Sequence, residues 1–289
     1  MIEGFPLRRL IFKKEISMKL SLTVLSALLG TSSFAAIGLK GSDTLAGLMT
    51  DTIVAAGLDA EINYLGTGSG NGEKAVVAGE QAVAPLSREM KPEALKSLEA
   101  QGLTAIGHKI ALDAIAIFVK DQGDLPVGLD VDTVKAIYTC QITDWAAVPG
   151  SQKKGTIRVL RRDDASGTTD AFKHFTGIKE FGACVTAMAS TEELSEETST
   201  DAQVLAYSGL SGKRAANKIL PLSSAAKNLG RTSPTVVNIR SGKYPFSRFL
   251  YVYEVASKLS TPERTLIEKM TDRTFIDPIV QNNGFITLD

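Results

Sequence analysis

Residues 157–175 read IRVLRRDDASGTTDAFKHF. The segment predicts a strand over 157–161, a loop containing two aspartates, and a helix over 166–175. Serine, glycine and threonine stand where this helix begins. A helix N-terminus has unpaired amide groups and a partial positive charge, so it suits an anion. The segment therefore predicts a strand–loop–helix unit with an anion site at the start of its helix.

Two other segments place glycine and small hydroxyl residues before a predicted helix. They are GSDT at 41–44 and GTGSGNG at 66–72. Glycine lets the backbone approach a ligand closely, and serine or threonine adds a hydroxyl donor. For any one loop, ordinary helix capping is the alternative explanation. Three such loops in one chain favour a shared anion site.

The glycine loop at 66–72 does not fit the motifs of nucleotide-binding proteins or hydrolases. A dinucleotide fingerprint needs glycines at i, i+2 and i+5, and only a loose form from Gly70 to Ala75 fits. The Gly-Lys-Ser/Thr of a P-loop is absent. A nucleophile elbow needs glycine two residues before and two residues after its serine, and Ser69 has Thr67 and Asn71 at those positions.

Strand-like and helix-like segments alternate along the chain, which predicts an α/β fold. The apolar run 110–119 is typical of a strand buried in a mostly parallel sheet. The acidic stretch 190–201 predicts a surface loop with a helix cap. The 289 residues include 32 basic and 32 acidic side chains and 44% hydrophobic residues. This balance argues against disorder and gives no field that would attract nucleic acid.

Residues 18–36, MKLSLTVLSALLGTSSFAA, have the pattern of a secretory signal peptide. We expect 1–36 to be removed and the product to be exported to a periplasm, without a lipid-anchoring cysteine. That compartment permits a disulfide between Cys140 and Cys184, and two separate thiols are the alternative. The two histidines, His108 and His174, lack partners at a suitable spacing, so we expect no metal, no cofactor and no catalytic residue.

Seven motifs occur in a fixed order along 37–289: GSDTL, YLGTGSGNG, SREMKPEA, IYTCQITDW, RRDDASGTTDAF, AYSGL and GKYPFSRFLYVY. Together they resemble the phosphate-binding subunits of bacterial phosphate ABC importers, the PstS-type periplasmic substrate-binding proteins. The resemblance implies a two-lobe α/β fold of periplasmic-binding-protein type II, with the ligand cleft between the lobes. One lobe would comprise 37–113 and 243–289, and the other 114–242.

The resemblance also implies a function. The chain would be a monomer that binds inorganic phosphate and delivers it to the membrane permease and ATPase subunits of an importer, without covalent chemistry. By position, the phosphate-binding residues would be Thr44, the Leu45 backbone, Ser69, Ser87, Arg88, Arg162, Ser166, Gly167 and Thr168. Supporting residues would be Ser42, Asp43 and Asp164, of which Asp164 would orient the guanidinium of Arg162.

One departure from the family concerns selectivity. Better-known members have an aspartate that accepts the proton of hydrogen phosphate, and this position is Ser87 here, followed by Arg88. Our hypothesis is that Asp43 supplies the acceptor, and the alternative is that Asp43 only caps the following helix. Other functions stay open: the same fold binding sulfate or molybdate, a phosphate sensor, or a secreted hydrolase of phosphate esters.

Overall fold

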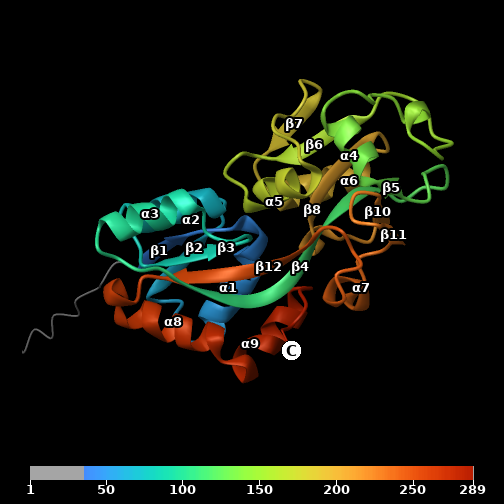
Figure 1. The fold of residues 1–289 in the computed structure, drawn as a ribbon. Helices are drawn as coiled ribbons and strands as arrows, with labels where there is room; N and C mark the ends of the chain where they lie inside the picture. Colours follow the sequence, from blue (N-terminus) through green and yellow to red (C-terminus); the bar gives the residue numbers. More distant parts are fainter. Residues whose placement is uncertain (1–35, 289) are drawn as a thin grey trace, which may run out of the picture. The chain divides into compact units, whose positions relative to one another are not determined.

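The strand β4 (Ile106–Lys120) belongs to both halves of the fold in the computed structural model, which describes residues 36–288. Its first half pairs antiparallel with β12 (Ser247–Glu254), and the two lie side by side in Figure 1. Its second half pairs antiparallel with β8 (Val204–Gly209) and β9 (Asn217–Leu220). The sheet runs in the order β3–β12–β4–β8–β6–β7, completed by β3 (Val83–Leu86), β6 (Arg158–Arg162) and β7 (Val185–Met188).

The prediction of a mostly parallel sheet around 110–119 is wrong. Strand β4 is antiparallel to each of its three partners, whereas β6 pairs parallel with β7 and β8. The side chains from Ala114 to Val119 are nevertheless buried on both faces of the sheet. An apolar run reports burial on two faces, and it carries no information about the direction of neighbouring strands.

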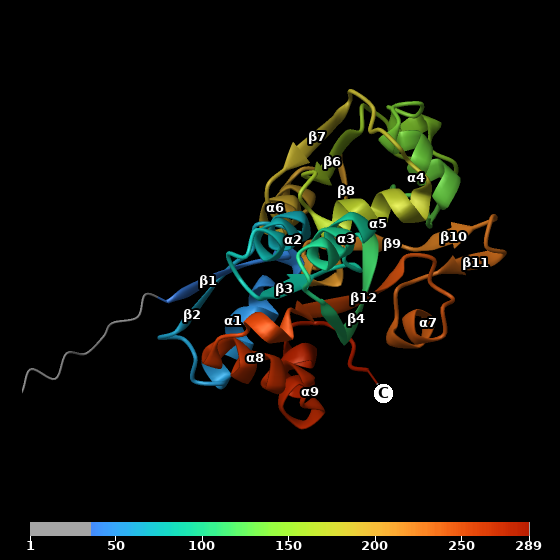
Figure 2. The same ribbon diagram turned by 60° about the vertical axis from the view of Figure 1, so that its left-hand side comes forward.

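One lobe, the first lobe, contains the N-terminal strands and the C-terminal helices. Strands β1 (Ile37–Lys40) and β2 (Ile62–Leu65) pair in parallel. Figures 1 and 2 show two helices on one side of the strands, α2 (Ser69–Val77) and α3 (Pro92–Ala100). On the other side lie α1 (Ala46–Ala55), α8 (Thr261–Thr271) and α9 (Arg273–Asn282). Their core includes Leu39, Leu48, Ile110, Leu250 and Leu266.

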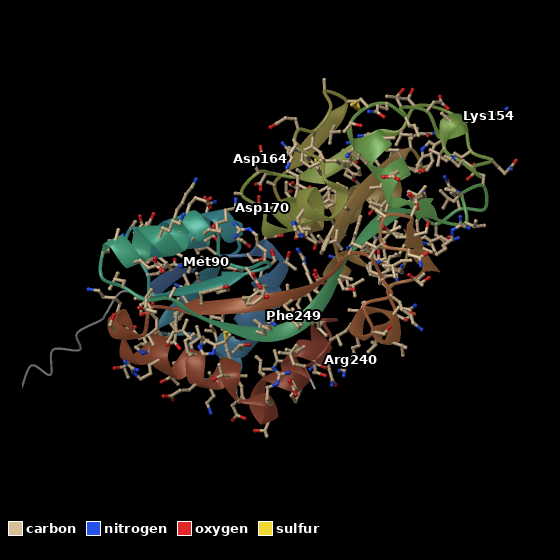
Figure 3. The ribbon with its side chains drawn as sticks, viewed as in Figure 1. Met90, Lys154, Asp164, Asp170, Arg240 and Phe249 are labelled. Carbon is tan, nitrogen blue, oxygen red and sulfur yellow. A yellow bond between two sulfur atoms is a disulfide. The ribbon has the colours of Figure 1, made fainter. Side chains whose placement is uncertain are left out.

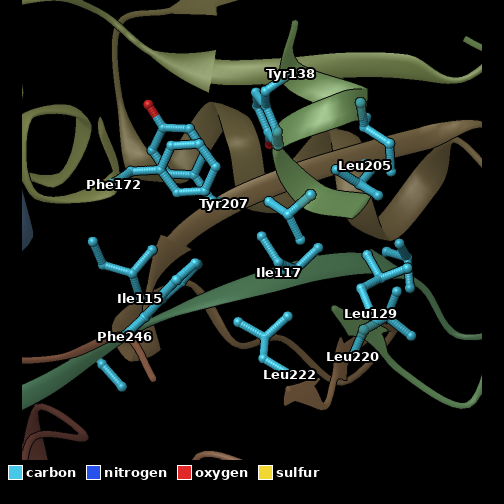
Figure 4. Close-up of a cluster of buried hydrophobic side chains, with 14 of the residues drawn as sticks. Ile115, Ile117, Leu129, Tyr138, Phe172, Leu205, Tyr207, Leu220, Leu222 and Phe246 are labelled. Carbon is cyan, nitrogen blue, oxygen red and sulfur yellow. The ribbon is translucent and has the colours of Figure 1, made fainter. Parts of the chain in front are cut away.

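The second lobe packs around a separate core. It contains α4 (Val131–Tyr138), α5 (Gly167–Thr176), α6 (Thr191–Thr200) and α7 (Val236–Arg240), and a small sheet of β11 (Leu229–Thr232), β10 (Leu222–Ser224) and β5 (Leu129–Asp130). Figure 4 shows Ile115 and Ile117 of β4 packed in this core with Phe172 and Tyr207. The rings of Phe172 and Tyr207 stack with centroids 3.9 Å apart, which fixes α5 against β8.

The acidic stretch 190–201 is a helix, α6, and not the predicted loop. Ser190 and Glu193 form a capping box at its start, and these two residues were the signal that sequence reasoning missed. Helix α3 begins with Pro92 at its first position, where the missing amide hydrogen costs nothing. Helix α2 begins at Ser69, inside the glycine loop, and α9 was not predicted. Short 3₁₀ turns occur at Asp43–Leu45, Trp145–Ala147, Leu210–Gly212 and Ala256–Lys258.

The two cysteines are joined. Cys140, just after α4, forms a disulfide with Cys184, just before β7, and their Cα atoms lie 5.9 Å apart.

The predicted signal peptide lies almost wholly outside the described residues. Within 36–288, no helix has the length and apolar character needed to cross a membrane. In the same range, no group of three or more His, Cys, Asp or Glu side chains could hold a metal ion.

Candidate functional site

The loop after β1 is held from two sides, and it places Thr44 in the interior. The Ser42 amide donates to the Pro85 carbonyl oxygen over 2.8 Å, and the Tyr64 hydroxyl donates to the Ser42 carbonyl oxygen over 2.8 Å. Burial raises the pKa of Tyr64 well above its usual value, and the charge of Asp43 adds to the shift. A side chain at Gly41 would come within 2.6 Å of the Tyr64 hydroxyl, so only glycine fits.

The glycine loop brings two serines together. Gly68 has a φ of 101°, a conformation that favours glycine, and α2 begins at the next residue, Ser69. The Ser69 hydroxyl oxygen accepts the Ser87 amide over 3.0 Å and lies 3.2 Å from the Ser87 hydroxyl. Both side chains are fully buried. Ser87, directly after β3, therefore stands beside the start of α2.

In the second lobe, the loop after β6 ends at the start of α5. The Ser166 hydroxyl caps this helix by accepting the amides of Thr168 and Thr169, over 3.2 and 3.4 Å. The Thr169 hydroxyl donates to the Arg162 carbonyl oxygen over 3.0 Å and lies 2.7 Å from the Tyr207 hydroxyl. These bonds fix the start of α5 to the end of β6, so Arg162 and the helix N-terminus form one unit.

The hydroxyl-rich loops of the two lobes touch. Thr44 Oγ1 lies 3.0 Å from Thr168 Oγ1, and the Gly70 amide donates to the Ala165 carbonyl oxygen over 3.0 Å. A Cβ atom on Gly167 would lie 2.3 Å from Ser69 Oγ. The predicted residues of both lobes thus meet in one buried group of donors, with α5 pointing its N-terminus at the serines of the first lobe.

Arg162 is the buried cation of this group, 1% exposed. Its Nη1 donates to Asp43 Oδ2 over 2.6 Å and to Thr191 Oγ1 over 2.9 Å, and its Nη2 donates to the Ala189 carbonyl oxygen over 2.7 Å. Its Nε is buried and has no hydrogen-bond partner among the described residues. A buried, unpaired donor on a guanidinium is costly, and an oxyanion oxygen would satisfy it.

The expectation that Asp164 orients Arg162 is wrong. Asp164 is 73% exposed in its side chain and pairs with Arg161, over 2.9 and 3.2 Å. The acid that holds Arg162 is Asp43, from the other lobe. Asp43 does not cap the helix after it, because no side-chain cap bond forms at Asp43–Leu45 or at α1. Its Oδ2 also accepts the Thr191 amide over 3.0 Å.

Arg88 is not free to bind a ligand in this structure. Its guanidinium forms a salt bridge with Glu73 of the first lobe and another, over 2.7 Å, with Asp170 of the second. Burial lowers its pKa, but hydrogen bonds and charges of Glu73 and Asp170 outweigh this effect and raise the pKa. In Figure 3, Asp170 and Asp164 lie on the side of the second lobe that faces α2. Arg88 therefore links the lobes ionically.

Two further predicted residues act through the backbone. The Leu45 amide, expected to meet the ligand, donates to the Ser42 carbonyl oxygen over 3.1 Å and is not free. The buried Ser42 contributes its amide and carbonyl to the bonds that hold the loop. Both residues therefore shape the turn that carries Thr44.

Sequence reasoning missed a buried ion pair beside Thr168. Arg248 of β12 donates from Nη2 and Nε to Asp113 Oδ2, over 2.7 and 2.9 Å, and from Nη1 to Thr168 Oγ1, over 3.0 Å. The signal was a charged residue inside each apolar strand segment, IALDAIAIFV and SRFLYVY. A charge at such a position needs a partner, and each residue supplies the other's.

Cavities open at the boundary between the lobes. One of about 450 Å³ is lined by Arg88, Asp170 and Arg248, among others, and one of about 380 Å³ by Asp43, Thr44 and Thr191 with their neighbours. Arg248 and Thr44 are hydrogen bonded to the same Thr168 hydroxyl oxygen. Polar side chains of the candidate site thus line cavities at this boundary.

Residues 30–269 match the family model of the PBP superfamily domain. This chain belongs to the PBP superfamily. It is 28% identical over 267 residues to the phosphate-binding protein PstS of Pseudomonas aeruginosa, covering 86% of this chain and 81% of that protein. The two-lobe α/β fold predicted from the motifs is confirmed.

Two solved structures show how far the likeness of this PBP superfamily member extends. The first is a putative phosphate ABC transporter substrate-binding protein from Clostridium perfringens, with bound phosphate. It has a TM-score of 0.76 and 20% identity, and 88% of this chain and 100% of that chain are covered. The second is an ABC-type phosphate transport receptor from Vibrio cholerae, with a TM-score of 0.69, 18% identity and coverage of 87% and 100%. At these identities the likeness establishes the fold.

Proposed function

We propose that this chain binds inorganic phosphate between its two lobes and delivers it to the permease and ATPase subunits of a membrane ABC importer. It acts as a monomer in the periplasm and performs no covalent chemistry. The names of its relatives support this proposal, since they are phosphate-binding proteins and phosphate transport receptors.

One observation carries the proposal: hydrogen-bond donors from both lobes converge in a buried place. Thr44, Ser69 and Ser87 come from the first lobe, and Arg162 and the N-terminus of α5 come from the second. The Nε of Arg162 is a buried donor without a hydrogen-bond partner among residues 36–288, and it could donate to an anion. Charge-assisted hydrogen bonds of this kind are stronger in a low-dielectric interior than in water.

The residues assigned to phosphate binding follow from this convergence. We assign direct contacts to Thr44, Ser69, Ser87, Arg162, Ser166, Gly167 and Thr168. Arg88 and Asp43 link the lobes through the salt bridges Arg88–Asp170 and Arg162–Asp43. Release of phosphate then requires these links to open, which is the hinge motion that binding proteins use.

The motifs placed the lobes at 37–113 with 243–289, and 114–242, and we propose to keep the first of these boundaries and to move the second. The two cores support the first crossing, because Ala111 packs in the core of the first lobe and Ala114 in that of the second. Tyr244 and Phe246 still pack in the second core, whereas Leu250 packs in the first. The second crossing therefore lies a few residues later than the motif-based boundary, near Arg248.

Thermal unfolding of the purified protein, stripped of ligand, tests the proposal with phosphate, arsenate and sulfate in turn. A ligand that binds only the folded state stabilises it by about 2.7 kcal/mol at 100 times its dissociation constant. We expect clear stabilisation by phosphate and arsenate. Stabilisation by sulfate alone would favour a different oxyanion, and no stabilisation by any of them would contradict the proposal.

A further inference from the structure

The pair Asp113–Arg248 lies where the chain crosses from one lobe to the other. Asp113 and Arg248 are directly opposite each other in the β4–β12 ladder. Asp113 follows Ala111 of the first core and precedes Ala114 of the second. Asp113 is fully buried and Arg248 is 7% exposed. Opposite charges at such a cross-strand position stabilise the pairing of the two strands.

The surroundings of the pair are closely packed. Asp113 Oδ1 accepts the Leu210 amide over 3.1 Å. A side chain at Gly209 would come within 2.8 Å of Asp113 Oδ2 and 3.2 Å of Thr44 Cγ2. The backbone of Gly209 and Leu210, in the AYSGL motif, thus packs closely against Asp113, and Gly209 also lies close to the Thr44 side chain. Two nitrogens of the Arg248 guanidinium, Nε and Nη2, donate to Asp113 Oδ2. The third nitrogen, Nη1, donates to Thr168 Oγ1.

The bond between Arg248 and Thr168 has only one possible direction, and it uses acceptor capacity of Thr168 without using the Thr168 proton. A guanidinium can only donate, so Thr168 Oγ1 accepts from Arg248 and keeps its own proton for another acceptor. Thr168 Oγ1 forms a second hydrogen bond with Thr44 Oγ1, 3.0 Å away, in which either hydroxyl can donate. The two hydroxyls together have two protons, and only one is used between them. The remaining proton is available to a third group, and an anion oxygen at the assigned site would accept it.

We propose that Arg248 is a positioning residue of the anion site: held by Asp113, it turns the Thr168–Thr44 hydroxyl pair into a donor toward the bound anion. This inference rests on the proposed function and deepens it. Because the pair lies at the crossing strands, it also ties the start of α5 to the segment about which the lobes move.

A double-mutant cycle on the phosphate dissociation constant, measured by calorimetry, tests the inference. The proteins are the wild type, Thr168→Val, the neutral pair Asp113→Asn with Arg248→Gln, and their combination. The neutral pair changes both partners because a lone buried charge would destabilise the fold. Arg248→Lys, which keeps a charge against Asp113, serves if the neutral pair does not fold. Arg158→Gln, an exposed arginine of the second lobe, is the matched control.

We expect Thr168→Val and the neutral pair each to weaken phosphate binding about tenfold or more, because the first removes a hydroxyl donor to the anion and the second removes the guanidinium that orients this hydroxyl. The combination should be no more than about twofold weaker than Thr168→Val, because Arg248 acts through that hydroxyl. Arg248→Lys should weaken binding only while Thr168 is present.

Two results would overturn the inference alone: wild-type affinity in the neutral pair or in Arg248→Lys, or losses that multiply in the combined variant. Multiplying losses would mean that Arg248 supports the fold or meets the anion directly. Failure of the wild-type protein to bind phosphate would instead overturn the proposed function, and this inference with it.

Discussion

Neighbouring arginines of one motif have opposite environments. Arg162 is 1% exposed and bonded across the lobes, whereas Arg161 pairs with the exposed Asp164. The alternation follows from the strand, since successive side chains of β6 point to opposite faces. Both residues are arginines, so their positions in β6 determine which guanidinium lies at the assigned anion site.

Arg162→Ala should weaken phosphate binding by about 100-fold or more, because the anion loses a charged donor in a buried place. The matched control is Arg161→Ala, which removes the same side chain from the neighbouring position. Calorimetric titration with phosphate measures both. Equal affinities in the two variants would show that Arg162 is not part of the site.

The two aspartates beside these arginines give a prediction for stability. Asp43→Asn should lower the free energy of unfolding by about 3 kcal/mol, because it leaves the buried charge of Arg162 without its partner. Asp164→Asn should change it by less than about 1 kcal/mol, because its pair is exposed. Urea unfolding of both variants without ligand checks this, and a larger loss for Asp164→Asn would restore the original assignment of the orienting acid.

At the scale of elements, the loops and helix starts around the site could be predicted from the sequence. Serine, glycine and threonine before a helix have a local meaning, so GSDT, GTGSGNG and ASGTT indicated an anion site. Partners across the lobes could not be predicted, because Asp43 and Arg162 are 119 residues apart. Asp113 and Arg248 are 135 residues apart, and their pairing depends on the register of β4 and β12.

The antiparallel direction of β4 relative to its neighbours also could not be predicted from local sequence patterns. The run 110–119 indicated a doubly buried strand, and antiparallel pairing with β12 and β8 satisfies that pattern as well as parallel pairing would. Helix α6 was missed although a local signal for it was present. Its acidic composition suggested a loop, but Ser190 and Glu193 form a capping box, which is a signal for the start of a helix.

The start of α5 offers a steric prediction. Gly167→Ala should weaken phosphate binding, because its Cβ would lie 2.3 Å from Ser69 Oγ and 2.5 Å from Ser87 Oγ across the lobes. The matched control is Gly70→Ala in α2, where the nearest atom, the Ala165 carbonyl oxygen, lies 3.4 Å away. The phosphate dissociation constant of each variant decides the matter, and tight binding by Gly167→Ala would show that the lobes bind phosphate farther apart.

The disulfide of the second lobe should affect stability and leave binding alone. Replacing both Cys140 and Cys184 by serine should lower the free energy of unfolding by about 3 kcal/mol, because the unfolded chain loses a cross-link. The phosphate dissociation constant should stay within about twofold of the wild type, since neither residue contacts the assigned site residues in the bonds described here. A large loss of affinity would indicate that the bridge positions α5.

At the scale of the whole molecule, each lobe has its own core, and two strands connect them. The lobes meet through hydroxyl contacts and through the salt bridges Arg162–Asp43 and Arg88–Asp170. These contacts are polar, and domains that meet through polar contacts commonly move relative to each other without unfolding. The proposed function therefore predicts that ligand binding and closure are coupled, because the assigned donors come from both lobes.

Calorimetric titration of the ligand-stripped protein with inorganic phosphate tests the central claim most directly. The account predicts saturable binding of one phosphate per chain, with donors from both lobes engaged at once. Absence of saturable phosphate binding, or binding of several phosphates per chain with equal weak affinity, would contradict it.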